Sequence, residues 1–254
     1  MLILLPPSEG KTAPTAGKPV CLEDLVFADQ LTKPREKIIR ELEKLGGRPV
    51  RKALDVMSIS AGQVGEIELN TRINSSLAAP AAEVYTGVLY DRLDFATLAS
   101  LARKRADGKV LIASGLWGML RPGDRIPYYR LSMKPKLARI GGLAGFWRNH
   151  LSQAMAGSGF DEPGQLVLDM RSGGYRSAWK PKHAEPVLVR GFTESAGRRK
   201  VISHMAKAVR GDVARLVLST GRMPTDLDGV AHLLSEAGLR IETGDDTLDV
   251  IEEV

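Results

Sequence analysis

Short runs of consecutive apolar residues are the clearest pattern along the chain, and they predict buried strands. The first run, Met1–Leu5, ends at Pro6 and Pro7, which cannot donate ladder hydrogen bonds and so end the strand. Similar runs predict strands over Lys109–Ser114, Gln165–Met170 and Pro186–Arg190, with further strand character at Ala79–Tyr85 and an edge strand in the tail, Thr243–Val254.

Between these runs, apolar residues recur with the spacing of amphipathic helices. The helix predicted over Thr32–Leu45 has Pro34 in its first turn and ends at Gly46 and Gly47. Thr225 and Asp228 fit a capping box at the start of the last helix. The predicted helices cover Thr32–Leu45, Arg51–Leu69 with a break near Ser58–Ala61, Leu93–Lys104, Phe146–Met155, His204–Leu218 and Thr225–Ala237. The pattern predicts an α/β fold, a mixed sheet flanked by helices, in a single domain over residues 1–254.

Composition narrows the class of protein. The chain has 254 residues, 43% of them hydrophobic and 26% charged, which is ordinary for a globular domain with a sizeable core. No apolar run approaches the roughly 20 residues that span a bilayer, so we expect no membrane partner. The single cysteine, Cys21, excludes an internal disulfide framework and favours a cytoplasmic location. Cys21 is interpreted as a small apolar residue rather than a peroxide-sensing thiol.

The four histidines, His150, His183, His204 and His232, show no metal-ligand spacing, so we expect neither a metal site nor a cofactor. His204, beside Ser203, is the best histidine candidate for acid–base chemistry. The net charge is +6, which favours anionic partners, either nucleic acid or a phosphorylated small molecule.

Polar and glycine residues follow three of the predicted strands. Because ligands in open α/β sheets bind at the carboxyl ends of strands, we expect these turns to meet in one basic cleft. The strand-end candidates are Ser8 and Lys11, then Ser114 and Gly115, then Asp169, Ser172 and Tyr175. The cations expected to line the same cleft are Lys11, Arg130, Lys180, Lys182, Lys207 and Arg210. Separately, the glycine-rich turn Gly141–Gly145 fits either a helix-hairpin-helix element, which binds DNA phosphates, or a plain turn between helices.

Short motifs follow one another along the chain: Met1–Leu4 with Pro7, Lys11 and Thr12; Val84–Gly87; Ser114 and Gly115 with Leu120–Pro122; Tyr129–Leu131; Phe146 and Trp147; Ser172 with Tyr175; Lys180–Lys182; and Ile202 and Ser203 with Ala206, Lys207, Arg210 and Gly211. This ordered set resembles the YaaA family of bacterial peroxide-stress proteins. The resemblance implies a cytoplasmic bacterial protein that limits damage from hydrogen peroxide and iron. It also implies a mixed α/β fold with a positive cleft and a helix-hairpin-helix-like element that binds DNA. The motif residues add Thr86, Tyr129 and Ser203 to the candidate anion ligands.

Two functions follow as hypotheses. The first is a DNA-binding stress protein, supported by the basic charge balance and the glycine-rich turn. The second is an enzyme that acts on a nucleotide-like or phosphorylated small molecule. In the second case Lys11 and Arg130 hold the anion, Ser114 and Ser172 orient it, and Tyr175 or Asp169 transfers a proton.

Overall fold

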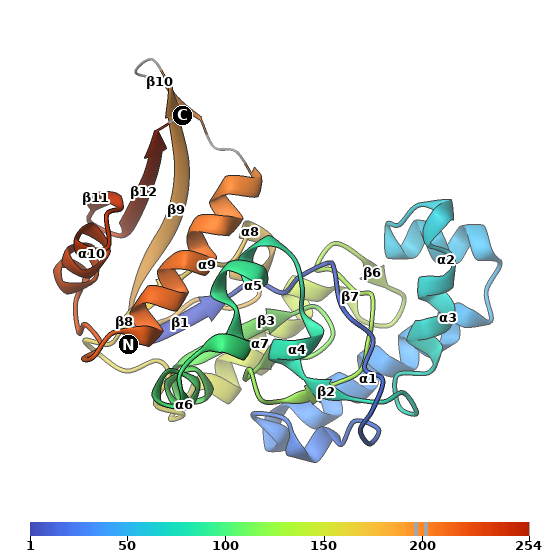
Figure 1. Cartoon of the computed structure of the whole chain (residues 1–254). Coiled ribbons are helices and arrows are strands. Elements are labelled where there is room, and N and C mark those ends of the chain that lie inside the picture. Colours follow the sequence, from blue (N-terminus) through green and yellow to red (C-terminus); the bar gives the residue numbers. More distant parts are fainter. Residues whose placement is uncertain (196–197, 201–202, 254) are drawn as a thin grey trace.

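The computed structural model describes residues 1–195, 198–200 and 203–253, and its main feature is a mostly parallel sheet (Figure 1). The strands of this sheet are β1 (Leu2–Leu5), β3 (Val110–Ser114), β4 (Gly118–Leu120), β8 (Leu166–Asp169), β9 (Glu185–Ser195), β10 (Arg198–Lys200), β11 (Arg240–Gly244) and β12 (Thr247–Glu253). Their order is β11-β12-β9-β8-β1-β3-β4, with β10 paired to β9. The neighbours from β12 to β3 run parallel, whereas β4, β10 and β11 are antiparallel to their partners.

Strand β1 lies at the centre of the parallel part. Leu4 is in register with Leu111 of β3 on one side and with Asp169 of β8 on the other. All four residues of β1 are buried, as expected for a strand covered on both faces. The connection from β1 to β3 leads to one side of β1, and the connection from β8 to β9 leads the other way. The carboxyl ends of β1 and β8 therefore form a topological switch point, where ligands bind in open α/β sheets.

Helices surround the sheet. The helices are α1 (Ala28–Gly46), α2 (Val50–Met57), α3 (Gly65–Thr71), α4 (Ala81–Val84), α5 (Val88–Leu93), α6 (Ser100–Lys109), α7 (Leu143–Met155), α8 (Gly173–Arg176), α9 (Ser203–Ser219) and α10 (Leu227–Glu236). Two small ladders complete the described part, β2 (Ala79–Pro80) with β5 (Arg125–Ile126) and β6 (Lys136–Leu137) with β7 (Gly141–Gly142). Helix α9 packs on β9 and α5, and α1 packs on α7 and α3. Helices α2 and α3 project at the end of the molecule farthest from α10 (Figure 1).

The four apolar runs that predicted buried strands are confirmed as β1, β3, β8 and β9, and the helix over Arg51–Leu69 is broken as expected into α2 and α3. The strand predicted over Ala79–Tyr85 is wrong beyond Pro80, where α4 begins. The helix predicted over Leu93–Lys104 is confirmed from Ser100 onwards as part of α6 and is wrong before it. Helix α5 ends at Leu93 because Asp94 has a left-handed backbone with φ 45°, and α6 starts only at Ser100.

Three local predictions are corrected at helix and sheet ends. Helix α1 starts at Ala28, so Pro34 lies inside it rather than in its first turn. The N-cap of α10 is Asp226, whose carboxylate accepts a hydrogen bond from the Gly229 amide at 2.8 Å. The predicted edge strand in the tail is β12, which lies between β9 and β11, so the edge is β11.

The turn Gly141–Gly145 does not join two helices. Gly141 and Gly142 form β7, which pairs with β6, and α7 starts directly afterwards at Leu143. The helix-hairpin-helix expectation is therefore wrong at this turn, because a strand precedes it. In the described part of the chain, no helix has both the length and the hydropathy required to cross a membrane.

Candidate functional site

The turn after β1 is fixed against the segment between α4 and α5. The Thr12 amide donates to the Val84 carbonyl at 2.8 Å, and the Thr86 amide donates to the Gly10 carbonyl at 3.2 Å. A Cβ atom at Gly10 would lie 3.1 Å from Thr86 Oγ1, so glycine lets the two segments approach closely. These contacts place Lys11 beside Tyr85 at the carboxyl end of the central strand.

The amino group of Lys11 lies in an aromatic environment. Its Nζ atom donates to the Ser8 carbonyl at 2.7 Å and lies 4.5 Å from the centroid of the Tyr129 ring and 5.4 Å from that of Tyr85. Desolvation by burial and the charge of Arg130 lower the pKa of Lys11 to about 7, against the opposing effect of Glu66 and Glu9. Near neutral pH this amine therefore exists in both the charged and the neutral form.

A chain of buried hydroxyls starts beside Lys11. The Tyr129 hydroxyl lies 2.7 Å from that of Tyr85 and 2.8 Å from Ser114 Oγ. Ser114 Oγ also accepts hydrogen bonds from the amides of Leu116 and Trp117. Because Ser114 accepts two amide hydrogens, its own hydroxyl hydrogen is directed to Tyr129, whereas either hydroxyl can donate in the Tyr129–Tyr85 pair. Ser114 is thus a buried member of this network rather than an exposed ligand.

Arg130 lies over the turn that carries Lys11. Its guanidinium donates to the carbonyl and to the carboxylate of Glu9, both at 3.1 Å. The Arg130 backbone is held by the buried Asn70 side chain, which accepts from its amide at 2.9 Å and donates to its carbonyl at 2.7 Å. The Arg130 side chain is 18% exposed and that of Glu9 is 73% exposed, so Glu9 is the partner that can leave.

Two further tyrosines complete this region. The Tyr90 hydroxyl donates to the Pro6 carbonyl at 2.7 Å. Tyr175, on the short helix α8 after β8, is half-buried, and burial together with the proximity of Tyr129 and Glu9 raises its pKa well above the usual range. We call this group the strand-end cluster: Ser8, Glu9, Lys11, Tyr85, Tyr90, Ser114, Tyr129, Arg130 and Tyr175. It unites the predicted residues Ser8, Lys11, Ser114, Tyr129, Arg130 and Tyr175, with Thr86 beside them.

Asp169 makes a buried ion pair at the end of β8. Its two carboxylate oxygens accept from Nε and a terminal nitrogen of Arg171 at 2.9 and 2.8 Å. The Arg171 guanidinium lies 5.6 Å from the Trp179 ring centroid. Arg210 donates to the Val189 carbonyl at 3.1 Å, and its pKa is lowered by burial and by Arg176, whereas Asp169 raises it. The two hydrogen bonds from Arg171 make Asp169 an anchor for the Arg171 side chain. Ser172, the next residue, is exposed.

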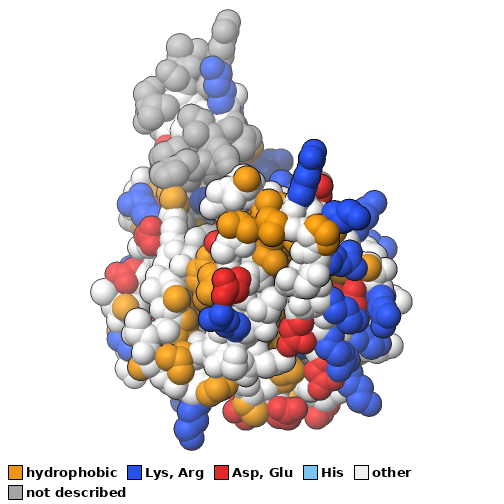
Figure 2. Space-filling model, turned by 90° about the vertical axis from the view of Figure 1, so that its right-hand side faces the viewer, with side chains coloured by type: hydrophobic (Ala, Val, Ile, Leu, Met, Phe, Trp, Pro, Cys, Tyr) orange, Lys and Arg blue, Asp and Glu red, His pale blue; other side chains and the backbone are white. Residues whose placement is uncertain are grey.

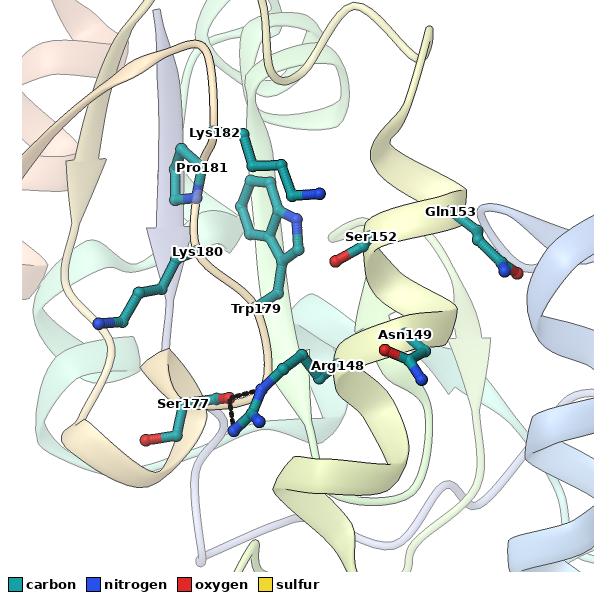
Figure 3. A pocket seen from close by; sticks show the side chains of 9 residues that line it. All are labelled: Arg148, Asn149, Ser152, Gln153, Ser177, Trp179, Lys180, Pro181 and Lys182. Atoms are coloured by element: carbon teal, nitrogen blue, oxygen red, sulfur yellow. Dashed lines mark hydrogen bonds between the residues drawn. The ribbon is translucent and has the colours of Figure 1, made fainter.

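Lys180 and Lys182 line a groove of about 710 Å³ along one side of α7 (Figure 3). Trp179 lies in the groove wall, and Arg148 of α7 reaches the Ser177 carbonyl across it at 3.3 Å. The described lining residues include these three cations and no Asp or Glu: Arg148, Asn149, Ser152, Gln153, Ser177, Trp179, Lys180, Pro181 and Lys182. No member of the strand-end cluster lines this groove, so Lys180 and Lys182 lie apart from Lys11 rather than in a shared cleft.

One carboxylate shapes the loop that carries these lysines. Asp161 accepts hydrogen bonds from the amides of Lys182, His183 and Ala184 at 2.9–3.0 Å. Burial opposes ionisation of Asp161, but the three amides outweigh it and lower its pKa below the usual value. The anchored loop presents Lys182 at the groove.

A second, smaller groove of about 320 Å³ lies on the other side of α7, towards α1. It carries four cations, two of which are paired with neighbouring acids: Lys44 with Glu41 at 2.7 Å and Arg40 with Glu36 at 3.4 Å. The groove is lined by Lys37, Arg40, Glu41, Lys44, Arg139, Ile140 and Phe146. Helix α7 therefore has basic side chains along both of its sides.

The other predicted site residues lie elsewhere. Gly115 faces the backbone carbonyls of Leu131 and Ser132, where a Cβ atom would lie 2.8 Å from each oxygen. Lys207 is exposed on α9. The side chains of Ser203 and His204 lie outside the described part. Sequence reasoning missed Tyr85, Tyr90 and Glu9 as members of this cluster, although four of the five tyrosines of the chain belong to it. It also missed Arg148, whose role depends on the packing of α7.

The comparisons with known proteins agree with one another. Residues 1–242 match the family described as Peroxide stress protein YaaA. A UPF0246 protein of Streptomyces coelicolor is 42% identical over 245 residues, covering 95% of this chain and 92% of that protein. A UPF0246 protein of Corynebacterium glutamicum is 37% identical over 246 residues, covering 95% of each chain. The chain therefore belongs to the YaaA family of peroxide stress proteins (UPF0246).

Proposed function

We propose that this protein acts in the bacterial cytoplasm during peroxide stress by binding DNA, with phosphate contacts along both sides of α7. The groove with Arg148, Lys180 and Lys182 carries the proposal. Arg148 and Lys182 concentrate positive potential where a phosphate chain can lie, without a carboxylate among the described lining residues. Lys180 lines the groove with its amine directed away from α7 (Figure 3). The second groove, with Lys37 and Arg139, extends the basic surface to the other side of the helix.

Helices α2 and α3 supply a second contact in this proposal. They flank a glycine-containing turn that runs from Ser58 to Val64 and includes Gly62. Arg48, Arg51 and Lys52 are exposed at the start of α2. Figure 2 shows Lys and Arg side chains gathered along one side of the face that bears this end of the molecule, with acidic side chains among them. A helix pair of this kind positions turn amides and nearby cations on DNA phosphates.

The test is the salt dependence of binding to a fluorescein-labelled DNA duplex, measured by anisotropy. The log–log plot of affinity against salt is expected to fall with a slope of about 0.9 per phosphate contacted. Replacing Arg148, Lys180 and Lys182 together by Gln is expected to reduce that slope by about 2–3 and to weaken binding by about tenfold or more.

The matched control replaces Lys18, Lys33 and Lys104 by Gln. These side chains are exposed, lie outside both grooves and carry the same total charge. A salt-independent affinity, or equal losses in the two triple variants, would contradict the proposal.

The second candidate function is an enzymatic activity at the strand-end cluster on a phosphorylated or nucleotide-like small molecule. The observation that favours it is the position of Lys11 and Arg130 at the topological switch point, within a network of buried hydroxyls. Such a molecule is expected to raise the melting temperature of the protein, and Arg130→Gln is expected to abolish that shift. An unchanged shift in the variant would remove this candidate.

A further inference from the structure

The amine of Lys11 has an unusual set of partners for a half-buried lysine. Within the described residues its one recorded hydrogen bond is to the Ser8 carbonyl, in its own turn, and no carboxylate lies within ion-pair distance. The nearest other groups are the faces of Tyr129 and Tyr85. Desolvating a lysine charge without a paired acid is costly, and here the amine lies against two aromatic rings. A lysine in this position is better suited to react as an amine than to stabilise the fold.

Glu66 adds a second feature. One of its carboxylate oxygens accepts a hydrogen bond from Tyr128 at 2.8 Å, and the other is buried with no hydrogen-bond partner among the described residues. Its charge acts on Lys11 together with those of Arg130 and Glu9. The surroundings of the amine thus contain a proton acceptor with an unused oxygen and several hydroxyl donors.

Arg130 provides a place for an anion beside the amine. Its present partner, the Glu9 carboxylate, is mostly exposed and lies on the same turn as Lys11. An anionic ligand that displaces Glu9 would gain the guanidinium and would bring the rest of the molecule close to Lys11.

We propose that Lys11 forms an imine with the aldehyde or ketone group of a phosphate-bearing substrate whose phosphate is bound by Arg130. The amine nitrogen attacks the carbonyl carbon to give a carbinolamine. One amine proton passes through the tyrosine hydroxyls to the former carbonyl oxygen during this addition. The resulting hydroxyl then leaves as water with the remaining proton of the nitrogen, and a carbon–nitrogen double bond remains. One water is released and no group is oxidised or reduced. With a small-molecule aldehyde this inference rests on the second candidate function and specifies its chemistry, and with an aldehyde in DNA it rests on the proposed DNA binding.

Two kinds of molecule can supply the aldehyde group and the phosphate. One is a free phosphorylated aldehyde. The other is the aldehyde of an abasic site in DNA, which is flanked by phosphates and would reach Lys11 in a protein that binds DNA. The two sources share the reacting group and differ in size, so the experiment contains one arm for each.

The full-length protein is incubated with glyceraldehyde 3-phosphate or with a duplex containing one abasic site, in the presence of sodium cyanoborohydride, which reduces an imine to a stable amine. Intact mass and peptide mapping then locate the adduct. Labelling of Lys11 is expected to exceed that of the exposed Lys18 by about tenfold or more, because an ordinary lysine is almost fully charged at neutral pH. Lys11→Arg is expected to lose the adduct, and the matched control Lys18→Arg to keep it.

Labelling of Lys11 by either probe supports the proposal, and the responding probe identifies the source. Absence of a Lys11 adduct with both probes, or labelling no stronger than at Lys18, overturns it. The melting temperature with glyceraldehyde 3-phosphate is measured in parallel, without reductant. A rise in melting temperature in both the parent and Lys11→Arg, without an adduct, would retain the small-molecule site and reject the imine.

Discussion

The hydroxyl of Tyr129 lies 2.7 Å from that of Tyr85, which joins the segment after β5 to the segment before α5 inside the strand-end cluster. Tyr129 also contacts Ser114 at 2.8 Å. Tyr129→Phe therefore breaks two buried hydrogen bonds, whereas Tyr85→Phe breaks one. We expect Tyr129→Phe to lower the free energy of unfolding by about 1–3 kcal/mol and Tyr85→Phe by less. Urea titration measures both. The reverse order would show that the Ser114 contact contributes little.

Lys11 is expected to make stability depend on pH. Its pKa is lowered from 10.5 to about 7 in the folded protein, so between these values the unfolded chain binds more protons. Stability therefore rises with pH across this window, and the full cost of the buried charge applies below it. We expect Lys11→Met to raise the melting temperature at about pH 6 by roughly 2–4 °C, which corresponds to about 1 kcal/mol. This gain should shrink as the pH approaches 10. A gain that is independent of pH would mean that Lys11 keeps its ordinary pKa.

Asp161 holds the loop that presents Lys182. Asp161→Ala removes the acceptor of three amide hydrogens and is expected to cost about 1–3 kcal/mol of stability. It is also expected to weaken DNA binding, although it removes a negative charge that would otherwise repel DNA. The matched control is Glu162→Ala, which removes the same charge from an exposed neighbour. Stronger DNA binding by Asp161→Ala would show that charge outweighs loop geometry.

The pair Asp169–Arg171 is expected to be structural. Removing one partner leaves a buried, unpaired charge, so Arg171→Met or Asp169→Asn should each cost about 3–5 kcal/mol. The double variant should cost clearly less than the sum, because it leaves neither charge alone. Chemical denaturation of the four proteins measures this coupling. Additive losses would indicate that the two residues act independently.

Gly211 lets α9 approach α5. A Cβ atom there would collide with the Leu89 carbonyl and lie 2.7 Å from Arg92 Cβ. We expect Gly211→Ala to destabilise the protein by about 1–3 kcal/mol through the displacement of one helix. At Gly221 a Cβ atom meets nothing within 4 Å, so Gly221→Ala serves as the control. Equal melting temperatures for the two variants would contradict this account.

The elements that can be predicted from the sequence are those whose own residue pattern determines their structure. Leu2–Leu5 is apolar at every position because both faces of the central strand are covered. The boundary at Asp94 was missed because the apolar spacing continues through a residue whose backbone turns left-handed. The place of β12 was also missed, because strand order depends on contacts with β9 and β11 that a single segment does not reveal.

The residues of the candidate site likewise fall into those that single segments predict and those whose position depends on packing. Lys11 and Ser114 were found because strand ends in a parallel sheet share one edge. Lys180 was assigned to that edge as well, but the chain after α8 leads it to the groove beside α7. The position of the loop relative to the sheet depends on how the helices pack, and the residues around Lys180 do not reveal that packing.

The central position of β1 has a consequence for synthesis on the ribosome. Strand β1 is made before both of its partners and can complete its ladder only after Val110 and Val167 have been made, because those residues begin its pairing with β3 and β8. Until then the leucine-rich strand β1 has no partner strands, and long-range parallel pairing is slow to form. Chaperone protection of β1 is therefore needed until β3 and β8 have been made.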